Sequence, residues 1–415
     1  MSTFALTELL RAPVFDSSGA QAGRVREVAL SPQDDPARLQ ALVVRTHDGS
    51  DRVLAMNQVE SINGMIKTRT KSADWPAFSA SEGLLLLERD LLDQQIIDVH
   101  GRKVVRVNDV DLHEELTNQH LVLKLAAVDV GARGAVRRLL KGVVPAAALR
   151  TLLRKLPEKM IPWEFVDLIE TDPARRVKLK ISHDRLAKLH PADIADIVEE
   201  LAPAEREAVF ETLDEEVAAE ALEEIEPKLQ RSIVESLDSD RAADIVEEMD
   251  PDAAADLLGD LSEERSEEIL KEMEPEQREE VSELLEFKEN TAAGRMTTEF
   301  IEVPFNANVS DAINRLRQFE GGMESLSTIY LLDESGKLAG AVPLSKLVLA
   351  TPGTPMRFLV SEPLISCAGG CSEKDVTELF DKYNLLTLPV LDEDGKLSGV
   401  ITADDVISLL RHKVK

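Results

Sequence analysis

Cysteine is scarce in this 415-residue sequence, which contains Cys367 and Cys371 and no other. Two thiols are too few for a disulfide framework, and such scarcity fits a reducing compartment. No stretch approaches the ~18 uninterrupted apolar residues of a membrane-spanning helix, and the N-terminus lacks the basic start and long apolar run of a signal peptide. Because 43% of the residues are apolar, the chain can bury several cores. We expect a soluble, cytoplasmic protein of roughly two to four domains.

Catalytic motifs are missing as well. The sequence contains no phosphate-binding Walker loop, no dinucleotide-binding glycine motif and no nucleophile elbow. The two cysteines have no histidine or further cysteine near them at the spacing of zinc ligands. These absences predict that the protein is not an enzyme.

Negative charge is concentrated in one segment. The formal net charge is −30, and residues 190–285 contain 34 acidic and 7 basic side chains, a local net charge of −27. Such a segment would repel phosphate groups, so nucleic acid is excluded as a partner. The negative charge instead indicates that this segment binds cations or a basic protein surface.

The acidic segment consists of successive twelve-residue units, which begin at His190, Ala202, Asp214, Glu226, Asp238, Asp250, Ser262 and Glu274. The twelfth position of each unit is apolar, and the eighth and ninth are mostly apolar pairs, a pattern that forms one stripe of a short helix. Several units carry proline at the second position, which the first turn of a helix tolerates. Helices this short are marginal alone, so we expect the units to stack into a superhelix over residues 185–290.

A second repeat lies near the C-terminus. The segment DESGKLAG, which begins at Asp333, recurs as DEDGKLSG, which begins at Asp392. Apolar runs precede and follow each copy, which predicts a strand, a tight turn, a strand and then a helix. We expect two β-α-β-β-α units, related by pseudo-twofold symmetry, within residues 291–415.

A third, weaker repeat is found at the N-terminus. The pattern Asp-x-x-Gly starts at Asp16 and again at Asp98, with β-type runs around both copies. We interpret residues 1–130 as two small β-barrel modules or one pseudo-duplicated barrel, and residues 131–184 as a basic helical connector. The predicted fold class is therefore multidomain α+β, with N-terminal β-barrel modules, an α-helical superhelix of short repeats and a C-terminal α/β pair.

The acidic superhelix offers candidate ligands for a cation. Asp252 and Asp256 are four residues apart, so both carboxylates lie on one face of a short helix. Like charges there are unfavourable unless a cation offsets them, and carboxylate oxygens suit Mg²⁺ or Ca²⁺. Asp240 and Asp244 have the same spacing, so the spacing alone fits a hydrated acidic surface equally well.

Three segments, HPADIAD from His190, DPDAAAD from Asp250 and TAAGRMT from Thr291, resemble the cytosolic part of the MgtE family of magnesium channels. The two C-terminal units resemble a pair of CBS domains, with GVITADD from Gly399 as the strand-to-helix segment. The N-terminal repeat resembles PRC-barrel modules. The transmembrane channel that follows in the MgtE family has no counterpart in this sequence, so we expect the sensor without the pore.

The resemblance implies a site in which Mg²⁺, or another divalent cation, bridges the superhelix to the CBS pair. The matching positions are the carboxylates of Asp252, Asp256 and Asp405 and the backbone carbonyl of Gly294. The implied function is a non-catalytic cytosolic magnesium sensor and regulatory protein. Its cation-dependent shape would be passed to a partner, for which a membrane metal transporter is expected.

A second role is open for the end of the second C-terminal unit. In CBS pairs a Thr-x-x-Asp element often holds the ribose of an adenine nucleotide, so the resemblance makes Thr402 and Asp405 candidate ligands of ATP or AMP. Thr402 fits a helix cap equally well. Two alternatives to the magnesium sensor therefore stay open: an adenine-nucleotide-responsive CBS regulator, and a PRC-barrel scaffold without a small ligand.

Two further surfaces are expected to meet partners. Because paired CBS domains usually form a symmetric dimer, the resemblance implies a homodimer through the helices Val376–Phe380 and Val406–Leu410. Residues 131–160 carry eight basic side chains and one acidic side chain on an apolar helical pattern. Such a helix can bind an anionic membrane surface, here the inner face of the membrane, or dock on the protein's own acidic superhelix.

Overall fold

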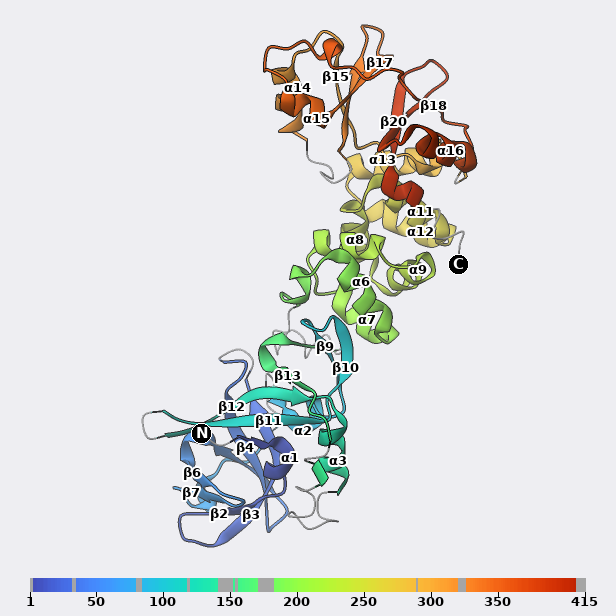
Figure 1. The fold of residues 1–415 in the computed structure, drawn as a ribbon. Helices are drawn as coiled ribbons and strands as arrows, with labels where there is room; N and C mark the ends of the chain where they lie inside the picture. Colours follow the sequence, from blue (N-terminus) through green and yellow to red (C-terminus); the bar gives the residue numbers. More distant parts are fainter. Residues whose placement is uncertain are drawn as a thin grey trace. The chain divides into compact units, whose positions relative to one another are not determined.

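The structure is a computed structural model, which describes residues 3–31, 35–79, 84–117, 120–140, 152–153, 156–170, 183–288, 290–319 and 326–407 (Figure 1). The chain divides into two compact units, Met1–Val217 and Ala218–Lys415. Among the helices within the described ranges, none combines the length and the apolar character that crossing a membrane requires.

Residues 3–168 of the first unit form a β-rich region. The elements of this region are β1 (Thr3–Ala5), α1 (Leu6–Leu9), β2 (Pro13–Phe15), β3 (Gln21–Leu30), β4 (Leu39–Thr46), β5 (Asp51–Ala55), β6 (Val59–Ile62), β7 (Ile66–Thr68), β8 (Leu85–Leu86), α2 (Leu87–Asp90), β9 (Gln95–Asp98), β10 (Lys103–Arg106), β11 (Asp109–Thr117), β12 (His120–Asp129), α3 (Ala132–Leu140), β13 (Met160–Pro162) and β14 (Val166–Leu168). The largest sheet has the order β5-β4-β3-β2-β7-β6, with β8 paired to β3, and two smaller sheets have the orders β1-β11-β12-β13 and β10-β9-β14. One continuous hydrophobic core includes Val25, Leu123 and Ile96, each from a different sheet.

The two halves of this unit exchange their short helices. Glu27 on β3 accepts hydrogen bonds from the backbone N–H groups of Glu88 (2.8 Å) and Arg89 (3.1 Å), in the first turn of α2. Asp109 on β11 accepts hydrogen bonds from the backbone N–H (3.2 Å) and the hydroxyl (2.5 Å) of Thr7, in α1. The strands cross over in the same way, because β8 pairs with β3 and β1 with β11. The N-terminal repeat therefore forms one duplicated unit, and its resemblance to PRC-barrel modules stays a prediction.

The β-rich region extends beyond the predicted boundary at residue 130. Strand β13 pairs antiparallel with β12, and β14 pairs antiparallel with β9. Residues 160–162 and 166–168 therefore belong to the sheets and not to a helical connector. The sequence pattern missed both strands because each is three residues long, too short to show an alternation of apolar and polar side chains.

Helix α3 forms the described start of the predicted basic connector. Its Arg137 lies 3.0 Å from a carboxylate oxygen of Asp109 and 3.6 Å from one of Asp111, and Arg138 forms an ion pair with Asp93. These two arginines therefore pair with acidic side chains of the β-rich region. The sequence predicted instead that the connector docks on a membrane or on the superhelix. The connector residues 141–151, 154, 155 and 171–182 lie outside the described part of the chain.

Each predicted twelve-residue unit contains one helix, as predicted. The helices are α6 (Pro191–Glu200), α7 (Pro203–Phe210), α8 (Glu215–Glu223), α9 (Pro227–Ser236), α10 (Ser239–Glu247), α11 (Pro251–Asp260), α12 (Glu263–Glu272) and α13 (Pro275–Leu285). Proline occupies the first helical position of α6, α7, α9, α11 and α13, where its missing N–H would have no partner in any case.

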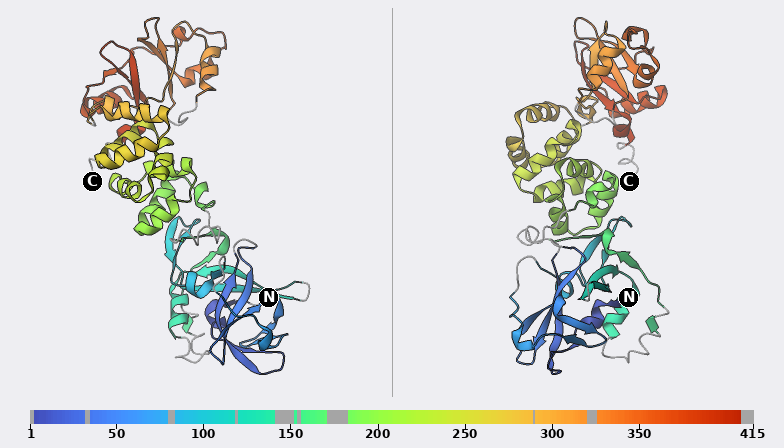
Figure 2. Two further views of the ribbon diagram at one scale, coloured as in Figure 1. Left: turned by 180° about the vertical axis from the view of Figure 1, so that it is seen from behind. Right: turned by 90° about the vertical axis from the view of Figure 1, so that its left-hand side faces the viewer.

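The packing of these helices repeats at every second helix. In the second unit α11 packs chiefly against α13, and α10 against α12, rather than against the next helix in sequence; Figure 2 shows these helices stacked one after another in yellow. The side chain of Gln230 donates a hydrogen bond to the backbone carbonyl of Leu222 (2.8 Å). Arg206, at the equivalent position two helices earlier, does the same to Val198 (3.0 Å). Two consecutive helices therefore make one structural repeat.

Two copies of one α/β unit complete the chain. The first contains β15 (Ile301–Pro304), α14 (Val309–Leu316), β16 (Thr328–Leu332), β17 (Leu338–Pro343) and α15 (Leu344–Leu349), and the second contains β18 (Cys367–Ala368), α16 (Glu373–Tyr383), β19 (Thr387–Leu391), β20 (Leu397–Thr402) and a helical turn at 403–407. In each copy the first strand is parallel to the second, which is antiparallel to the third. The hydroxyl oxygens of Thr328 and Thr387, at equivalent positions of the two copies, lie 3.2 Å from each other. The predicted pseudo-twofold pair is confirmed.

Candidate functional site

The junction between the helical repeats and the C-terminal pair is fixed to the second α/β unit by its backbone. Ala292 N–H donates to the carbonyl of Cys371 (2.8 Å), and Ala293 N–H donates to the carbonyl of Gly369 (2.9 Å). Thr297 exchanges two backbone hydrogen bonds with Val400 of β20 (2.8 and 2.9 Å). The short helical turn Ala293–Arg295 therefore keeps a fixed place beside this unit, within reach of α11 and α13.

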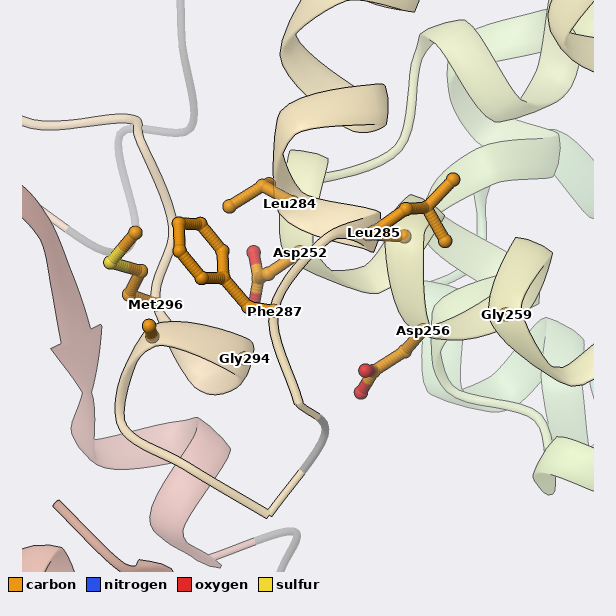
Figure 3. Close-up of a pocket in the computed structure, with 10 residues that line it drawn as sticks. Asp252, Asp256, Gly259, Leu284, Leu285, Phe287, Gly294 and Met296 are labelled. Carbon is orange, nitrogen blue, oxygen red and sulfur yellow. The ribbon is translucent and has the colours of Figure 1, made fainter. Parts of the chain in front are cut away.

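A cavity of about 70 Å³ lies where α11 and α13 meet this junction, and Figure 3 shows the side chains around it. Its lining consists of Asp252, Ala255, Asp256, Gly259, Leu284, Leu285, Phe287, Ala293, Gly294 and Met296. The structure thus brings together three of the four residues that the sequence predicts for a cation site, Asp252, Asp256 and Gly294. The carboxylate of Asp252 points towards the loop that carries Gly294.

The fourth predicted residue, Asp405, lies outside the cavity lining but interacts electrostatically with Asp252. Burial, followed by the negative charges of Asp405 and Asp250, raises the pKa of Asp252 well above its ordinary value. Burial also raises the pKa of Asp405 to about 6, against the effect of the hydrogen bond from the Thr402 hydroxyl. Helix α11 and the turn after β20 therefore present carboxyl groups to each other, in a setting that disfavours two negative charges.

Asp256 has a different environment, because its carboxylate forms an ion pair with Arg295 of the junction. The Nε of Arg295 also lies 3.3 Å from the Oε1 of Glu373, the first residue of α16. Sequence reasoning missed Arg295, although it stands inside the segment that carries the MgtE resemblance. The available signal was a basic side chain next to an acid-rich segment.

The oxygen donors around Asp252 fit a hard divalent cation. The described residues contain no group of three or more His, Cys, Asp or Glu placed to hold a metal ion. They offer instead two carboxylates, those of Asp252 and Asp405, and the nearby backbone at Gly294. Mg²⁺ commonly keeps several waters and binds through one or two carboxylates, so this donor set suits a partly hydrated ion.

Thr402 and Asp405, the predicted nucleotide ligands, bind each other. The backbone N–H of Thr402 donates to the Asp405 carboxylate (3.0 Å), as does the Thr402 hydroxyl. Thr402 is 3% exposed, and this arrangement caps the helical turn that follows. At the equivalent place in the first unit, Lys346 donates to the carbonyl of Leu359 (3.0 Å). A nucleotide site at Thr402 and Asp405 stays a prediction.

Comparison with known proteins identifies two parts of the chain. Residues 189–290 match the MgtE intracellular N domain, and residues 358–412 match the CBS domain. The magnesium transporter MgtE of Thermus thermophilus is 32% identical over 133 residues, which make up 32% of this chain and 30% of the transporter. The one from Enterococcus faecalis is 31% identical over 135 residues, again 30% of its length. The chain thus spans less than a third of the curated relatives that it matches.

Two solved structures cover more of the chain. The soluble part of a magnesium transporter is 26% identical with a TM-score of 0.53, covering 56% of this chain and 92% of that one. The cytosolic domain of the Mg²⁺ channel MgtE in complex with ATP is 29% identical with a TM-score of 0.52, covering 57% of this chain and 94% of that one. From residue 189 onward, the chain is therefore an MgtE intracellular N domain followed by a CBS pair, homologous to the cytosolic part of MgtE magnesium transporters.

Proposed function

We propose that the N domain and the CBS pair form a non-catalytic regulatory module that responds to Mg²⁺, or to another divalent cation, by binding it between Asp252 and Asp405. The Gly294 carbonyl is the additional oxygen donor in this proposal. The bound ion joins the acidic superhelix to the CBS pair, and the resulting shape is read by a partner. The kinship with MgtE transporters supports a metal transporter in the membrane as that partner and the cytoplasm as the location.

The juxtaposition of Asp252 and Asp405 carries this proposal. Both are acids, they come from different domains, and each lies partly buried. Within the described residues, no basic side chain forms an ion pair with either of them. Burial and the neighbouring negative charges raise the pKa of both carboxyl groups, so two negative charges here are unfavourable without a counter-ion. A divalent cation would offset these charges and favour the ionised form of both carboxylates.

Calorimetric titration of the purified chain with Mg²⁺ tests the proposal. Asp252→Asn and Asp405→Asn should each weaken Mg²⁺ binding by about tenfold or more, since each removes one of two charged ligands. Asp240→Asn is the matched control, because Asp240 is an exposed acid on α10 of the same superhelix. Equal affinities for the wild type and all three variants would refute the site.

An adenine nucleotide is the second candidate ligand, favoured by the homologous cytosolic domain that was solved with ATP. Thr402 and Asp405 would have to give up the hydrogen bonds that they share in order to bind a ribose. Titration with ATP and with AMP, each in chelator, separates this candidate from the first. Loss of nucleotide binding in Thr402→Val, with Mg²⁺ binding retained, would identify the nucleotide site.

The predicted dimer interface offers one strongly exposed apolar side chain in its described part, and its outcome stays open. Val376, Phe380 and Val406 are at most 7% exposed within the monomer, Ile407 is 64% exposed, and residues 408–410 lie outside the described part. Val348 and Leu349 of α15 are instead 84% and 88% exposed. We place the contact of the proposed homodimer on these two side chains, because exposed apolar side chains gain most from burial in an interface.

A further inference from the structure

Arg295 stands between carboxylates that belong to two different domains. Its guanidinium forms an ion pair with Asp256 on α11, and its Nε lies 3.3 Å from Glu373 on α16. The side chains of Arg295 and Glu373 are 25% and 11% exposed, and that of Asp256 is 41% exposed. The partial burial of the guanidinium reduces the screening of both pairs by water and salt, and it does so less on the side of Asp256.

The backbone around Arg295 belongs to the CBS side of the contact. Ala292 and Ala293 bind the turn before α16, and Thr297 binds β20. Met296 packs against Gly399, where a Cβ would lie 2.7 Å from the Met296 sulfur. Arg295 and Glu373 are therefore held together within one domain, so the pair between Arg295 and Asp256 is the one that links this domain to the helical repeats.

The positive charge of Arg295 beside Asp256 also opposes the binding of a metal ion there. The guanidinium occupies one oxygen of Asp256 and repels a divalent cation that approaches the same carboxylate. Asp252, one helical turn earlier, forms no ion pair with the basic side chains that the structure describes. Asp252 and Asp256 therefore differ, because Asp256 forms an ion pair with Arg295 and Asp252 forms none with the basic side chains that the structure describes.

We propose that Arg295 is a built-in counter-ion, which holds the helical repeats against the CBS pair without a metal and excludes a metal from Asp256. The exclusion of a metal from Asp256 rests on the proposed function, because it concerns which carboxylates the ion reaches. The metal-free link between Arg295 and Asp256 does not rest on it. Depletion of Mg²⁺ then loosens the contact at Asp252 and Asp405 but leaves the link at Asp256 in place.

Hydrogen exchange of the junction 291–298 in chelator and low salt tests the link. Arg295→Gln should exchange about fivefold faster than the wild type or more, as expected for a partly buried ion pair. The matched control is Arg315→Gln, since Arg315 is exposed on α14 and forms no ion pair among the described residues. Raising NaCl to about 0.5 M should speed exchange in the wild type and leave Arg295→Gln unchanged.

Two further variants keep the test decisive. Asp256→Asn should also speed exchange, and the double variant should exchange no faster than Arg295→Gln alone, because Arg295→Gln already removes the pair with Asp256. Arg295→Lys keeps the charge and should keep most of the protection, which covers the case in which Arg295→Gln fails to fold by circular dichroism. Wild-type exchange rates in both Arg295→Gln and Asp256→Asn would overturn the link.

Calorimetry with Mg²⁺ tests the exclusion from Asp256. Arg295→Gln should bind Mg²⁺ about fivefold more tightly or take up an additional ion, since the repulsive charge is gone. Unchanged Mg²⁺ binding would overturn the exclusion alone. If neither the wild type nor the variant binds Mg²⁺, the proposed function fails, whereas the link is still decided by the exchange measured in chelator.

Discussion

Glu27 and Asp109, which occupy equivalent positions in the two halves of the N-terminal unit, each bind the first turn of the helix that belongs to the other half. A carboxylate, a helix and a short strand all cross over between the halves. Each half is therefore complete only in the presence of the other. We expect the two halves to unfold in one cooperative transition.

Removal of one of these caps should destabilise the whole N-terminal unit. Glu27→Ala deprives three backbone N–H groups, those of Val28, Glu88 and Arg89, of a carboxylate acceptor in a buried place. This change should lower the free energy of unfolding by about 1–3 kcal/mol. Glu60→Ala, at an exposed acid on β6, should change it by less than about 0.5 kcal/mol. Urea unfolding followed by circular dichroism measures both. Equal effects would show that the cap contributes nothing.

Asp167 should make stability depend on pH. Burial raises its pKa to about 6, although the charge of Arg185, 3.8 Å away, opposes this. The folded chain thus binds the proton more tightly than the unfolded chain, whose carboxyl has an ordinary pKa near 4. The resulting stabilisation is complete below about pH 4 and is lost as the pH rises through about 6, a change of about 1–3 kcal/mol.

Asp167→Asn should remove this part of the pH dependence. The amide oxygen can still accept the hydrogen bond from the N–H of Leu186 (3.2 Å), and it does not titrate. Between pH 4.5 and pH 7 the wild type should therefore lose about 1–3 kcal/mol of unfolding free energy relative to the variant. Unfolding measured at both pH values for both proteins gives this difference. Parallel pH profiles for the two proteins would contradict the prediction.

Gly399 should tolerate no side chain. A Cβ there would lie 2.7 Å from the sulfur of Met296 and 2.7 Å from the carbonyl oxygen of Thr297, so Gly399→Ala should lower the free energy of unfolding by about 1–3 kcal/mol and speed hydrogen exchange at the junction. Gly370→Ala is the control, because a Cβ at that position would meet nothing within 4 Å. A loss of the same size in both variants would locate the effect in the backbone rather than in the contact.

The proposed dimer should depend on α15. Light scattering at micromolar concentration should give a homodimer for the wild type and a monomer for Leu349→Asp, since a charge in an apolar interface is costly. Leu386→Asp tests the place of the contact, because Leu386 is 64% exposed but lies outside α15, and this variant should stay dimeric. A monomeric wild type would rule out the dimer itself.

Sequence reasoning reached the parts of the fold that repeat. The twelve-residue units and the two C-terminal copies predicted the helices and both α/β units because local apolar periodicity determines such elements. It ended the β-rich region too early, because β13 and β14 pair with strands that are distant in sequence and three-residue strands have no pattern of their own. It named Asp252, Asp256 and Gly294, which share one cavity, but it had no means of placing Arg295 against Asp256.

The two-helix packing period limits how the superhelix can change in length. Helices pack against the helix two places along, so odd-numbered and even-numbered helices occupy different positions in the superhelix. Loss of one twelve-residue unit would move every later helix into the other kind of position. The side chain at the position of Gln230 would then no longer face the carbonyls at the end of a helix. Loss or gain of two helices together keeps each one in register with the helix two places along. Homologous chains should therefore differ in this region by whole pairs of helices.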